Sequence, residues 1–526
     1  MLDHEPIFGK NVIETLSEGM YDNPLFLFRE YVQNAADAID AAVRSGILHE
    51  GEGQIAIAID ADKRLIVFED NGTGIAAADF KAMLANIGNS IKDRNTDKGF
   101  RGIGRLGGLG YCQKVRFETS LKGESIKSFM EWDARNLHDI LANPNEKISA
   151  GQLIKRITST WEEPCDVDSH FFKVSLANIK TENDDLLDVA DVRRYLSMVA
   201  PVPFDYERFR FVADIEDFIK KNNLPTPHEY NLFLNNQEIR KGYATPLVIE
   251  RTGKTVDILA VECALLKKDE KIIGWYWYCV SEFDGVLPVS CWQRGFRLRK
   301  ANIQIGEYDC LANHPRHGQK LWREDRGNNY FLGEVHALDE GLVPNSRRDY
   351  FNQDAICRRF ETVLCDAFRN LHDLYHDASA ARSAREKIHA AAKVQADFIA
   401  KEKSGTFYNA KERELERQKV GDAQKKAQEA QRVIAKLQEK AEGGLIPSAN
   451  SVPLAKVVEV YRPDTTLTKS KPFVPDVCPK RGFVKDNLNK GERRILDMVF
   501  KVLEGKLPPD EIVPIRDEIL RRAARL

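Results

Sequence analysis

The clearest pattern of apolar and polar positions lies near the N-terminus, between Phe28 and Ala42. Apolar side chains recur there every three or four residues, at Phe28, Tyr31, Val32, Ala35, Ala38, Ile39 and Ala42. This spacing is typical of a helix that buries one stripe of side chains. We therefore predict a helix from Leu25 to Ser45, preceded by a shorter amphipathic helix from Asn11 to Gly19.

Three polar residues of the longer helix, Glu30, Asn34 and Asp37, are spaced four and three positions apart and therefore share one face. A carboxylate one turn from a carboxamide can hold a water molecule with one group and Mg²⁺ with the other, because Mg²⁺ prefers oxygen ligands and keeps several waters. Most charged helix positions are simply solvated, so by itself this pattern favours a plain acidic face.

The next segments predict an antiparallel hairpin. Gln54–Asp60 alternates apolar and polar residues, and Arg64–Asp70 is a second β-branched run. The second strand ends at Asp70, which is followed by Gly72 and Gly74. Two glycines let the backbone turn tightly and approach a flat ligand, and Asp70 is placed to accept a hydrogen bond. The same residues also suit an ordinary Asx-Gly turn.

A glycine-rich segment follows a helix that we expect from Asp79 to Ile87 and the polar residues around Ser90. Six of the twelve residues at 99–110 are glycine. Backbone N–H groups in such a segment can surround phosphate oxygens. The segment is not a Walker A loop, because no Gly-Lys-Ser/Thr closes it, and no strand directly precedes it as in a dinucleotide fingerprint. A flexible surface loop is the alternative.

Three segments, taken in order, resemble the nucleotide-binding boxes of the GHKL ATPases, a superfamily that includes gyrase, the 90-kilodalton heat-shock chaperones, histidine kinases and MutL. They are Glu30-x3-Asn34-Ala-x-Asp37-Ala, Asp70-x-Gly72-x-Gly74 and the glycine-rich residues 99–110. The first box, with its flanking Phe28-Arg, is most similar to that of the HtpG-like heat-shock chaperones.

The resemblance implies a Mg²⁺-dependent ATPase with Glu30 as general base, Asn34 as the Mg²⁺ ligand and Asp70 as the adenine anchor. These roles agree with the chemistry of a carboxylate that orients water and a hard oxygen ligand for the metal. Further nucleotide contacts are implied for Asp37, Gly72, Gly74, Ser90, Gly104, Gly107, Gly108 and Gly110. Residues 99–110 would form an ATP lid. This lid is one residue longer than the chaperone pattern, so the pairing of glycines with phosphates stays open.

Strands and helices continue after the lid. Strands are predicted at Ser125–Trp132, Gln152–Thr160 and His170–Asn178, and a short helix at Arg193–Val199. Strands on one side and helices on the other predict an α+β two-layer sandwich. The resemblance implies that this sandwich is the GHKL, or Bergerat, ATP-binding domain, and we place it at residues 1–204.

Residues 205–375 are predicted to form a second α/β domain, which the resemblance implies is transducer-like and of the ribosomal-S5-like type. Its expected strands are Tyr230–Asn235, Thr255–Val261, Ile272–Val280 and the stretch Gln293–Ile305. The last stretch carries alternating basic residues. We interpret them as a solvated strand face, and contact with a phosphate is the alternative.

A candidate catalytic arginine lies in the segment 344–349, Pro-Asn-Ser-Arg-Arg-Asp. It resembles the segment of the chaperone middle domain that ends in Ser-Arg-Glu and reaches the γ-phosphate. The resemblance implies that Arg347 or Arg348 senses ATP and neutralises developing charge. Aligning Ser346-Arg347 favours the first arginine, and aligning Arg348-Asp349 favours the second. The alternative is a helix N-cap at Ser346 followed by ordinary surface arginines.

The composition changes after the second domain. Residues 376–442 are rich in Ala, Lys, Glu, Gln and Arg, which predicts a charged helical or coiled-coil stalk, broken near Ser404 and near Gly421. Residues 443–481 form a proline-rich linker, and 482–526 a small helical module. We expect the helices of this module at Asn489–Leu503 and Asp510–Leu526.

The bulk composition narrows the class of protein. A chain of 526 residues, 43% hydrophobic and 30% charged, is typical of globular protein with about two to four domains. A formal net charge of −2 gives no general attraction to nucleic acid. The nine cysteines include no CxxC pair, which argues against a zinc site or a disulfide framework and favours a reducing cytoplasm. No apolar run is long enough to cross a membrane.

The resemblance implies an ATP-driven conformational clamp like the heat-shock-90 chaperones: a cytoplasmic homodimer whose lid and dimer close on ATP and which binds unfolded protein clients of unspecified identity. The alternative is a MORC- or MutL-like ATPase clamp on DNA, with bacterial defence as one setting. Those families place a lysine where the chaperones place the arginine, so the arginine pair at 347–348 favours the chaperone-like function.

Overall fold

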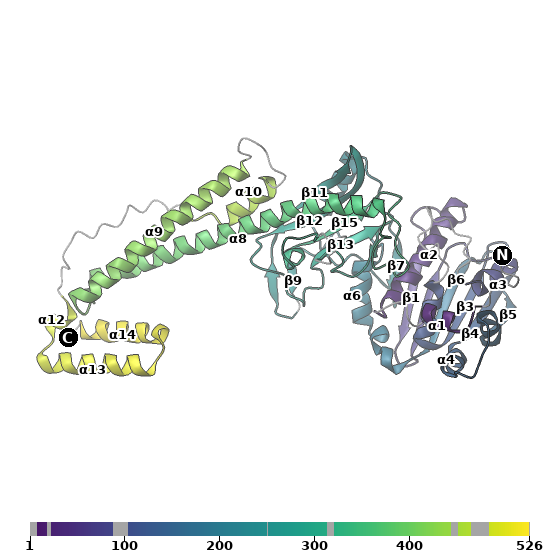
Figure 1. The fold of residues 1–526 in the computed structure, drawn as a ribbon, viewed down its shortest axis with the longest axis horizontal. Coiled ribbons are helices and arrows are strands. Elements are labelled where there is room, and N and C mark those ends of the chain that lie inside the picture. The colour runs from purple at the N-terminus through teal and green to yellow at the C-terminus, as the bar shows by residue number, and fades with distance from the viewer. Residues whose placement is uncertain are drawn as a thin grey trace. The chain divides into compact units, whose positions relative to one another are not determined.

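The structure is a computed structural model that describes residues 8–17, 23–87, 104–249, 251–312, 320–442, 451–463 and 483–524. The chain divides into two compact units (Figure 1). The first comprises Met1–Val280 and Gly285–Arg369, and the second Ser281–Asp284 and Asn370–Leu526. None of the described helices combines the length and the apolar character that a membrane span requires.

An eight-stranded sheet forms the first half of the first unit, in the order β5-β4-β3-β6-β2-β1-β7-β8. Its strands are β1 Gln54–Asp60, β2 Leu65–Asp70, β3 Cys112–Ser120, β4 Ile126–Asp133, β5 Thr158–Pro164, β6 Phe171–Ile179, β7 Asn231–Leu234 and β8 Gln237–Glu238. The accompanying helices are α1 Asn11–Ser17, α2 Phe26–Arg44, α3 Ala77–Ala85, α4 Ala134–Ala142, α5 Ala150–Ile157 and α6 Val189–Val199, with the 3₁₀ helices η1 Gly104–Gly110 and η2 Thr181–Leu187. The predicted hairpin at 54–70 is confirmed, since β1 and β2 are antiparallel neighbours.

Helix α2 packs across the centre of this sheet. The predicted apolar stripe is buried except at Ala38, which is half-buried, and the rings of Phe28 and Tyr31 lie 5.4 and 4.6 Å from the ring of Phe68 on β2. Aromatic packing of this kind fixes the rotation of the helix, because only one stripe of side chains fits the sheet. The polar residues of α2 are thereby held in fixed directions relative to the end of β2.

The strand predicted at Gln152–Thr160 is wrong in its first half. Those residues form α5, and β5 begins only at Thr158. Ser149 and Gln152 form a capping box that starts the helix, while Leu153 and Ile157, one turn apart, are its buried residues. A capping box followed by apolar residues four positions apart is a helix signal.

The strand expected at Tyr230–Asn235 exists, but it belongs to the first sheet rather than to the second. There it is β7, which lies parallel to β1 with Asn231 opposite Gln54. Helix α7, Val212–Lys221, precedes it and packs in the core of the second sheet, beside Trp275. The chain therefore builds part of the second core before it returns to complete the first sheet. The domain boundaries themselves stay predictions.

A second sheet of five strands follows, in the order β11-β12-β15-β13-β14. The strands are β11 Ile258–Lys268, β12 Lys271–Ser281, β13 Gly295–Lys300, β14 Ile303–Ile305 and β15 Leu332–Ala337; β9 Leu247–Ile249 and β10 Lys254–Val256 form a separate ribbon, and η3 Gly327–Tyr330 precedes β15. The relation of this sheet to the ribosomal-S5 type stays a prediction.

The basic stretch at 293–305 differs from its interpretation as a solvated strand face. It folds into a hairpin, β13 and β14, with a turn at Ala301-Asn302, where both residues have positive φ. Arg297 is 5% exposed and Arg299 is fully buried, so the solvated interpretation is wrong. The reason is tertiary: β13 lies inside the sheet between β15 and β14, and side chains that point to either face are covered.

The second unit is helical. Its elements are α8 Ala355–Ser404, whose first turns belong to the first unit, α9 Ala410–Ala441, α10 Ser451–Val460, α12 Val484–Asn487, α13 Lys490–Lys506 and α14 Pro509–Ala523. Helices α8 and α9 run side by side (Figure 1), joined by the Lys440–Asp377 ion pair near one end. The break near Ser404 is confirmed, but Gly421 lies inside α9. Part of the expected linker is α10, and 443–450 and 464–482 lie outside the described residues.

Candidate functional site

Glu30 occupies the centre of the candidate site. It is only 6% exposed, and its Oε1 lies 3.6 Å from Nη2 of Arg29 and 3.7 Å from Nε of Arg348. Both distances exceed that of a hydrogen bond, and Oε1 has no hydrogen-bond partner in the described part of the chain. A buried carboxylate oxygen without a donor is costly, so a water or ligand is expected to satisfy it.

Arg348 reaches Glu30 from a turn that follows the second sheet. Its backbone is in the left-handed region, with a φ of 54°, which costs a residue with a side chain about 1–3 kcal/mol. The carbonyl of Arg348 accepts a hydrogen bond of 2.8 Å from the N–H of Gly306, which holds the turn in place. Of the two arginines named from the sequence, Arg348 is buried and Arg347 exposed. The turn is not a helix, so Ser346 is not a helix N-cap.

The other polar residues of α2 extend from Glu30 toward the end of β2. Asn34 is half-buried and Asp37 is buried, on the same face of the helix as Glu30. Gln33 was not singled out from the sequence, yet it is 1% exposed and its side-chain amide has no hydrogen-bond partner among the described residues. A bound water or ligand would satisfy these buried polar groups of Gln33 and Glu30.

The turn after β2 packs tightly against α2 and β3. Asp70, 5% exposed, accepts a 2.9 Å hydrogen bond from the N–H of Gly72. A Cβ at Gly72 would lie 2.6 Å from the Cβ of Ala38. Gly74 has a φ of +68°, and a Cβ there would lie 1.9 Å from the carbonyl of Ser120. Only glycine fits either position.

Two polar residues beside this turn have no sequence motif. The hydroxyl of Thr119 accepts from the N–H of Ile75 at 3.0 Å and donates to the carbonyl of Phe171 at 2.7 Å. A ring nitrogen of His170 lies 2.9 Å from the carbonyl of Gly72. Thr119 lies near the end of β3 and His170 just before β6, and only the pairing of distant strands brings them to this turn. No local signal could have identified them.

The described part of the lid segment, Gly104–Gly110, is the 3₁₀ helix η1. It contains Gly104, Gly107, Gly108 and Gly110, whereas Ser90 and residues 99–103 lie outside the described residues. Leu106 and Leu109 are buried. A Cβ at Gly108 would lie 2.8 Å from the hydroxyl of Tyr31 and 2.7 Å from Leu176, so this glycine is required for packing against α2 and β6.

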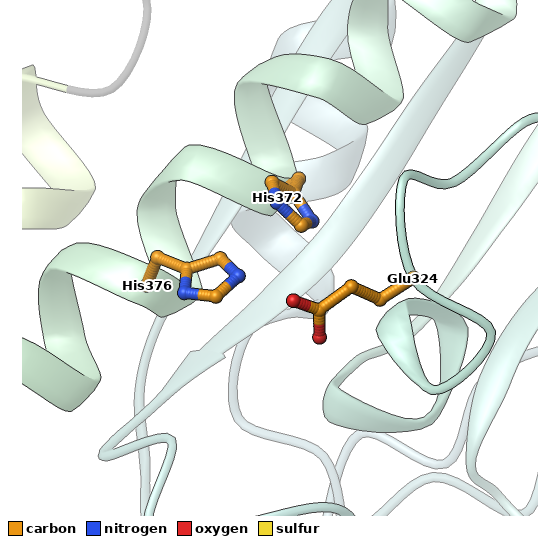
Figure 2. Close-up of side chains that lie close together, drawn as sticks. All are labelled: Glu324, His372 and His376. Carbon is orange, nitrogen blue, oxygen red and sulfur yellow. The ribbon is translucent and has the colours of Figure 1, made fainter.

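A second group of titratable residues lies on α8. His372 and His376 are one turn apart, with ring centroids separated by 4.4 Å, and the hydroxyl of Tyr375 lies 2.9 Å from Nδ1 of His372. Figure 2 shows both imidazoles and the carboxylate of Glu324. The histidines belong to the second unit and Glu324 to the first. Within α8, the two tilted imidazoles and the Tyr375 hydroxyl pack against one another.

The comparisons with known proteins concern the segment that carries α2, β2 and η1. Residues 27–160 match a family model described as histidine kinase-, DNA gyrase B- and HSP90-like ATPase. The chaperone protein HtpG of Psychrobacter cryohalolentis is 28% identical over 161 residues, which are 27% of this chain and 24% of that protein. HtpG of Shewanella baltica is 28% identical over 28% of this chain and 26% of that protein. HtpG of Escherichia coli is 26% identical over 24% and 23%.

These matches span about a quarter of the length of the curated relatives. They coincide with the elements that hold Glu30, Asn34, Asp70 and the glycines of the turn and of η1. Residues 27–160 are therefore a domain of the histidine kinase-, DNA gyrase B- and HSP90-like, or GHKL, ATPase family.

Proposed function

We propose that this protein is an ATP-binding and ATP-hydrolysing conformational clamp that resembles the heat-shock-90 chaperones. One observation carries the proposal: Arg348, from the turn after the second sheet, stands 3.7 Å from Glu30 on α2. The sequence predicts a catalytic role for each residue from a separate segment, Glu30 from the first box and Arg348 from the segment 344–349. Their approach, within a domain of the GHKL family, supports a single centre assembled from both sheets.

The residues of the site suit an adenine nucleotide with Mg²⁺. Asp70 ends β2 beside the tight turn that Gly72 and Gly74 allow, where its carboxylate could accept from the exocyclic amine of an adenine. The half-buried amide of Asn34 offers the hard oxygen that Mg²⁺ prefers. The unpaired Oε1 of Glu30 offers an acceptor for a water molecule. The metal would supply charge neutralisation at the β- and γ-phosphates.

In this mechanism Glu30 orients the attacking water and takes its proton, because it is the buried carboxylate with a free acceptor oxygen. Arg348 neutralises the charge that develops on the transferred phosphoryl group. Asp70 accepts a hydrogen bond from the exocyclic amine of the adenine. The residues of the lid segment exclude water from the centre once it is closed, which strengthens each of these electrostatic contacts.

The proposal extends to a chaperone role and to closure of a dimer. Relatives over the ATPase segment carry the name chaperone protein HtpG, which supports a chaperone role here. We propose a cytoplasmic homodimer in which ATP closes the lid and the dimer, and in which turnover is limited by closure rather than by chemistry.

The test measures Mg²⁺-dependent ATP turnover together with nucleotide affinity in the full-length chain. We expect Glu30→Ala to bind ATP with unchanged affinity but to lose hydrolysis, because the base is removed and the adenine anchor is kept. Glu50→Ala, an exposed glutamate just after α2, is the matched control and should behave as wild type. Normal turnover in Glu30→Ala would contradict the base assignment, and no nucleotide binding by the wild type would contradict the whole proposal.

A further inference from the structure

A buried cluster of ionisable groups surrounds Glu334 on β15, whose side chain is fully buried. Its carboxylate lies 2.9 Å from Nζ of Lys241 and 2.7 Å from Nε of Arg299. The hydroxyl of Tyr243 donates to it at 3.2 Å, and Nε2 of His336 lies 3.0 Å away. Four polar groups thus converge on one carboxylate, which leaves it no free oxygen for acid–base chemistry.

The members of the cluster come from both halves of the first unit. Lys241 follows β8 of the first sheet, whereas Arg299 and Glu334 belong to the second sheet. Arg299 also donates to the carbonyl of Met198 at the end of α6. In the hairpin turn, the side chain of Asn302 accepts from Lys241 at 3.2 Å and donates to the carbonyl of His228 at 2.8 Å. The cluster therefore fastens β13 and β15 to elements of the ATPase half.

Because its charges are buried, the cluster contributes more to selecting the register between the two sheets than to stability. Desolvation opposes the charge of Lys241 and lowers its pKa to about 8, while the two cations hold the pKa of Glu334 well below its ordinary value despite its own burial. A buried ion pair contributes little more to stability than apolar packing would. Its attested use is to select one register between packed elements, because any other register leaves charges unpaired.

A short path connects the cluster with the catalytic arginine. Arg299 on β13 is paired with Gln304 on β14, and the amide of Gln304 donates to the carbonyl of Gly306 at 2.9 Å. The N–H of Gly306 donates to the carbonyl of Arg348 at 2.8 Å. A parallel contact lies next to it, since Asn23, just before α2, donates to Glu307 at 2.7 Å.

We propose that Glu334, with Lys241 and Arg299, is a positioning centre that sets the register of the second sheet on the ATPase sheet and so places Arg348 at Glu30. The inference rests on the proposed ATPase function. In this scheme the arginine stands at the site before nucleotide arrives, and the cluster selects ATP over ADP indirectly, through the γ-phosphate contact. Glu334 touches no reactant.

The first experiment compares Glu334→Gln with wild type in ADP affinity, ATP affinity and kcat. ADP affinity should stay within about twofold, because the adenine pocket is built by the first sheet alone, while kcat falls about 100-fold, as expected for a displacement of about 1 Å. The preference for ATP over ADP should be lost. Lys271→Met, which removes the exposed amine at the start of β12 that pairs with Asp339 just after β15, is the matched control and should change none of these quantities.

A paired variant separates positioning from stability. Lys241→Met with Glu334→Gln removes one charge of each sign and leaves no orphaned lysine. The positioning role predicts that the thermal midpoint returns to near the wild-type value while kcat stays low. Recovery of kcat together with the midpoint would show that the cluster only stabilises the fold, and would overturn the proposal.

Hydrogen exchange followed by mass spectrometry tests the register without nucleotide. In Glu334→Gln, peptides that cover residues 23–31 and 344–351 should exchange about tenfold faster than in wild type, with β3 unchanged. Unchanged exchange in both peptides would overturn the proposal. The exchange measurement tests the positioning role even if the wild type hydrolyses no ATP. If the wild type is active, an unchanged kcat in Glu334→Gln would overturn the positioning role but leave the proposed ATPase function intact.

Discussion

Arg348 is distinguished from its neighbour Arg347 by its surroundings alone. Both are arginines in one turn, yet Arg348 is buried against Glu30 and has a left-handed backbone, whereas Arg347 is exposed. Strained backbone of this kind persists only where neighbouring contacts enforce it, and it is concentrated at functional sites.

Arg348→Ala should therefore reduce kcat by about 100- to 1,000-fold, the range for loss of one preorganised cationic or hydrogen-bonding group. Arg347→Ala should leave kcat within about twofold, because an exposed side chain contributes little to transition-state stabilisation. Steady-state ATP turnover of the two variants checks the prediction, and similar losses in both would contradict it.

His336 gives the fold a pH dependence of known sign. Burial lowers its pKa to about 4 from 6.5, against the opposing effect of Glu334, while Lys241 and Arg299 also disfavour its charged form. Between about pH 6.5 and pH 4, His336 is therefore protonated in the unfolded chain but neutral in the folded chain. The stabilisation is complete above pH 6.5 and is lost as pH falls toward 4.

The shift predicts a loss on the order of 2–3 kcal/mol of unfolding free energy between about pH 7 and pH 4, and most of it appears above the range in which carboxylates titrate. Urea unfolding at about pH 7 and about pH 5 measures it. His336→Gln is the control, because it removes this titration and keeps a polar side chain. The same loss in that variant would exclude His336 as its source.

At the residue scale, the sequence identified positions whose role depends on local spacing. Glu30, Asn34 and Asp37 share a helix face, and Asp70 ends a strand, because both features follow from short-range periodicity. It could not identify Gln33, whose burial depends on tertiary packing, or His170, whose polar partner is the distant carbonyl of Gly72. It also placed the basic residues of β13 in solvent, because a basic strand is buried only where distant partners satisfy it.

At the scale of elements, Gly306 links the loop after β14 to the turn that carries Arg348, because its N–H donates to the carbonyl of Arg348. Its φ is +68°, and a Cβ there would lie 2.5 Å from the carbonyl of Asp349 and 2.7 Å from Cys310. Asp349 adjoins Arg348 in the same turn, so a side chain at Gly306 would displace that turn.

Gly306→Ala is accordingly expected to lower kcat by about 10- to 100-fold through displacement of that turn, with nucleotide affinity retained. Gly421→Ala is a useful control, since nothing lies near the added methyl group and the position is inside α9. Turnover and ADP binding distinguish the two variants. Wild-type kcat in Gly306→Ala would mean that the turn does not depend on this contact.

Elements with strong local periodicity were predicted well, and those defined by distant pairing were not. α2, the β1–β2 hairpin, α13 and α14 follow from spacing and turn residues. The sheet to which β7 belongs could not be inferred, because a parallel pairing leaves no mark on the strand itself. α5 was mistaken for a strand even though its capping box is local.

At the scale of the molecule, helix α13 offers a testable candidate surface for the proposed dimer. Helix α13 exposes Ile495, Met498 and Val502 at helical spacing, each more than half exposed. A stripe of this kind on a two-helix module is typical of a contact between helices. The order of the charged stalk, linker and terminal module was predicted from composition, but α10 within the linker was not.

We expect Met498→Glu to shift the full-length chain toward the monomer, because a buried unpaired charge opposes association. Lys490→Glu, at the exposed first residue of α13, should have no such effect. Light scattering across a range of protein concentrations measures the change, with ADP affinity as a check on folding. A wild type that is already monomeric would exclude the proposed dimer.

The path of the chain through the first unit has a consequence for how it folds. Phe209 and α7 pack in the second core, Leu232 and Ile239 then pack in the first, and Tyr243 returns to the second. Neither core can be completed while the other is open, so the two halves should lose structure in one cooperative transition. Amide protection of β3 and β12 is expected to disappear at the same urea concentration, whereas independently folding halves would show two separate midpoints.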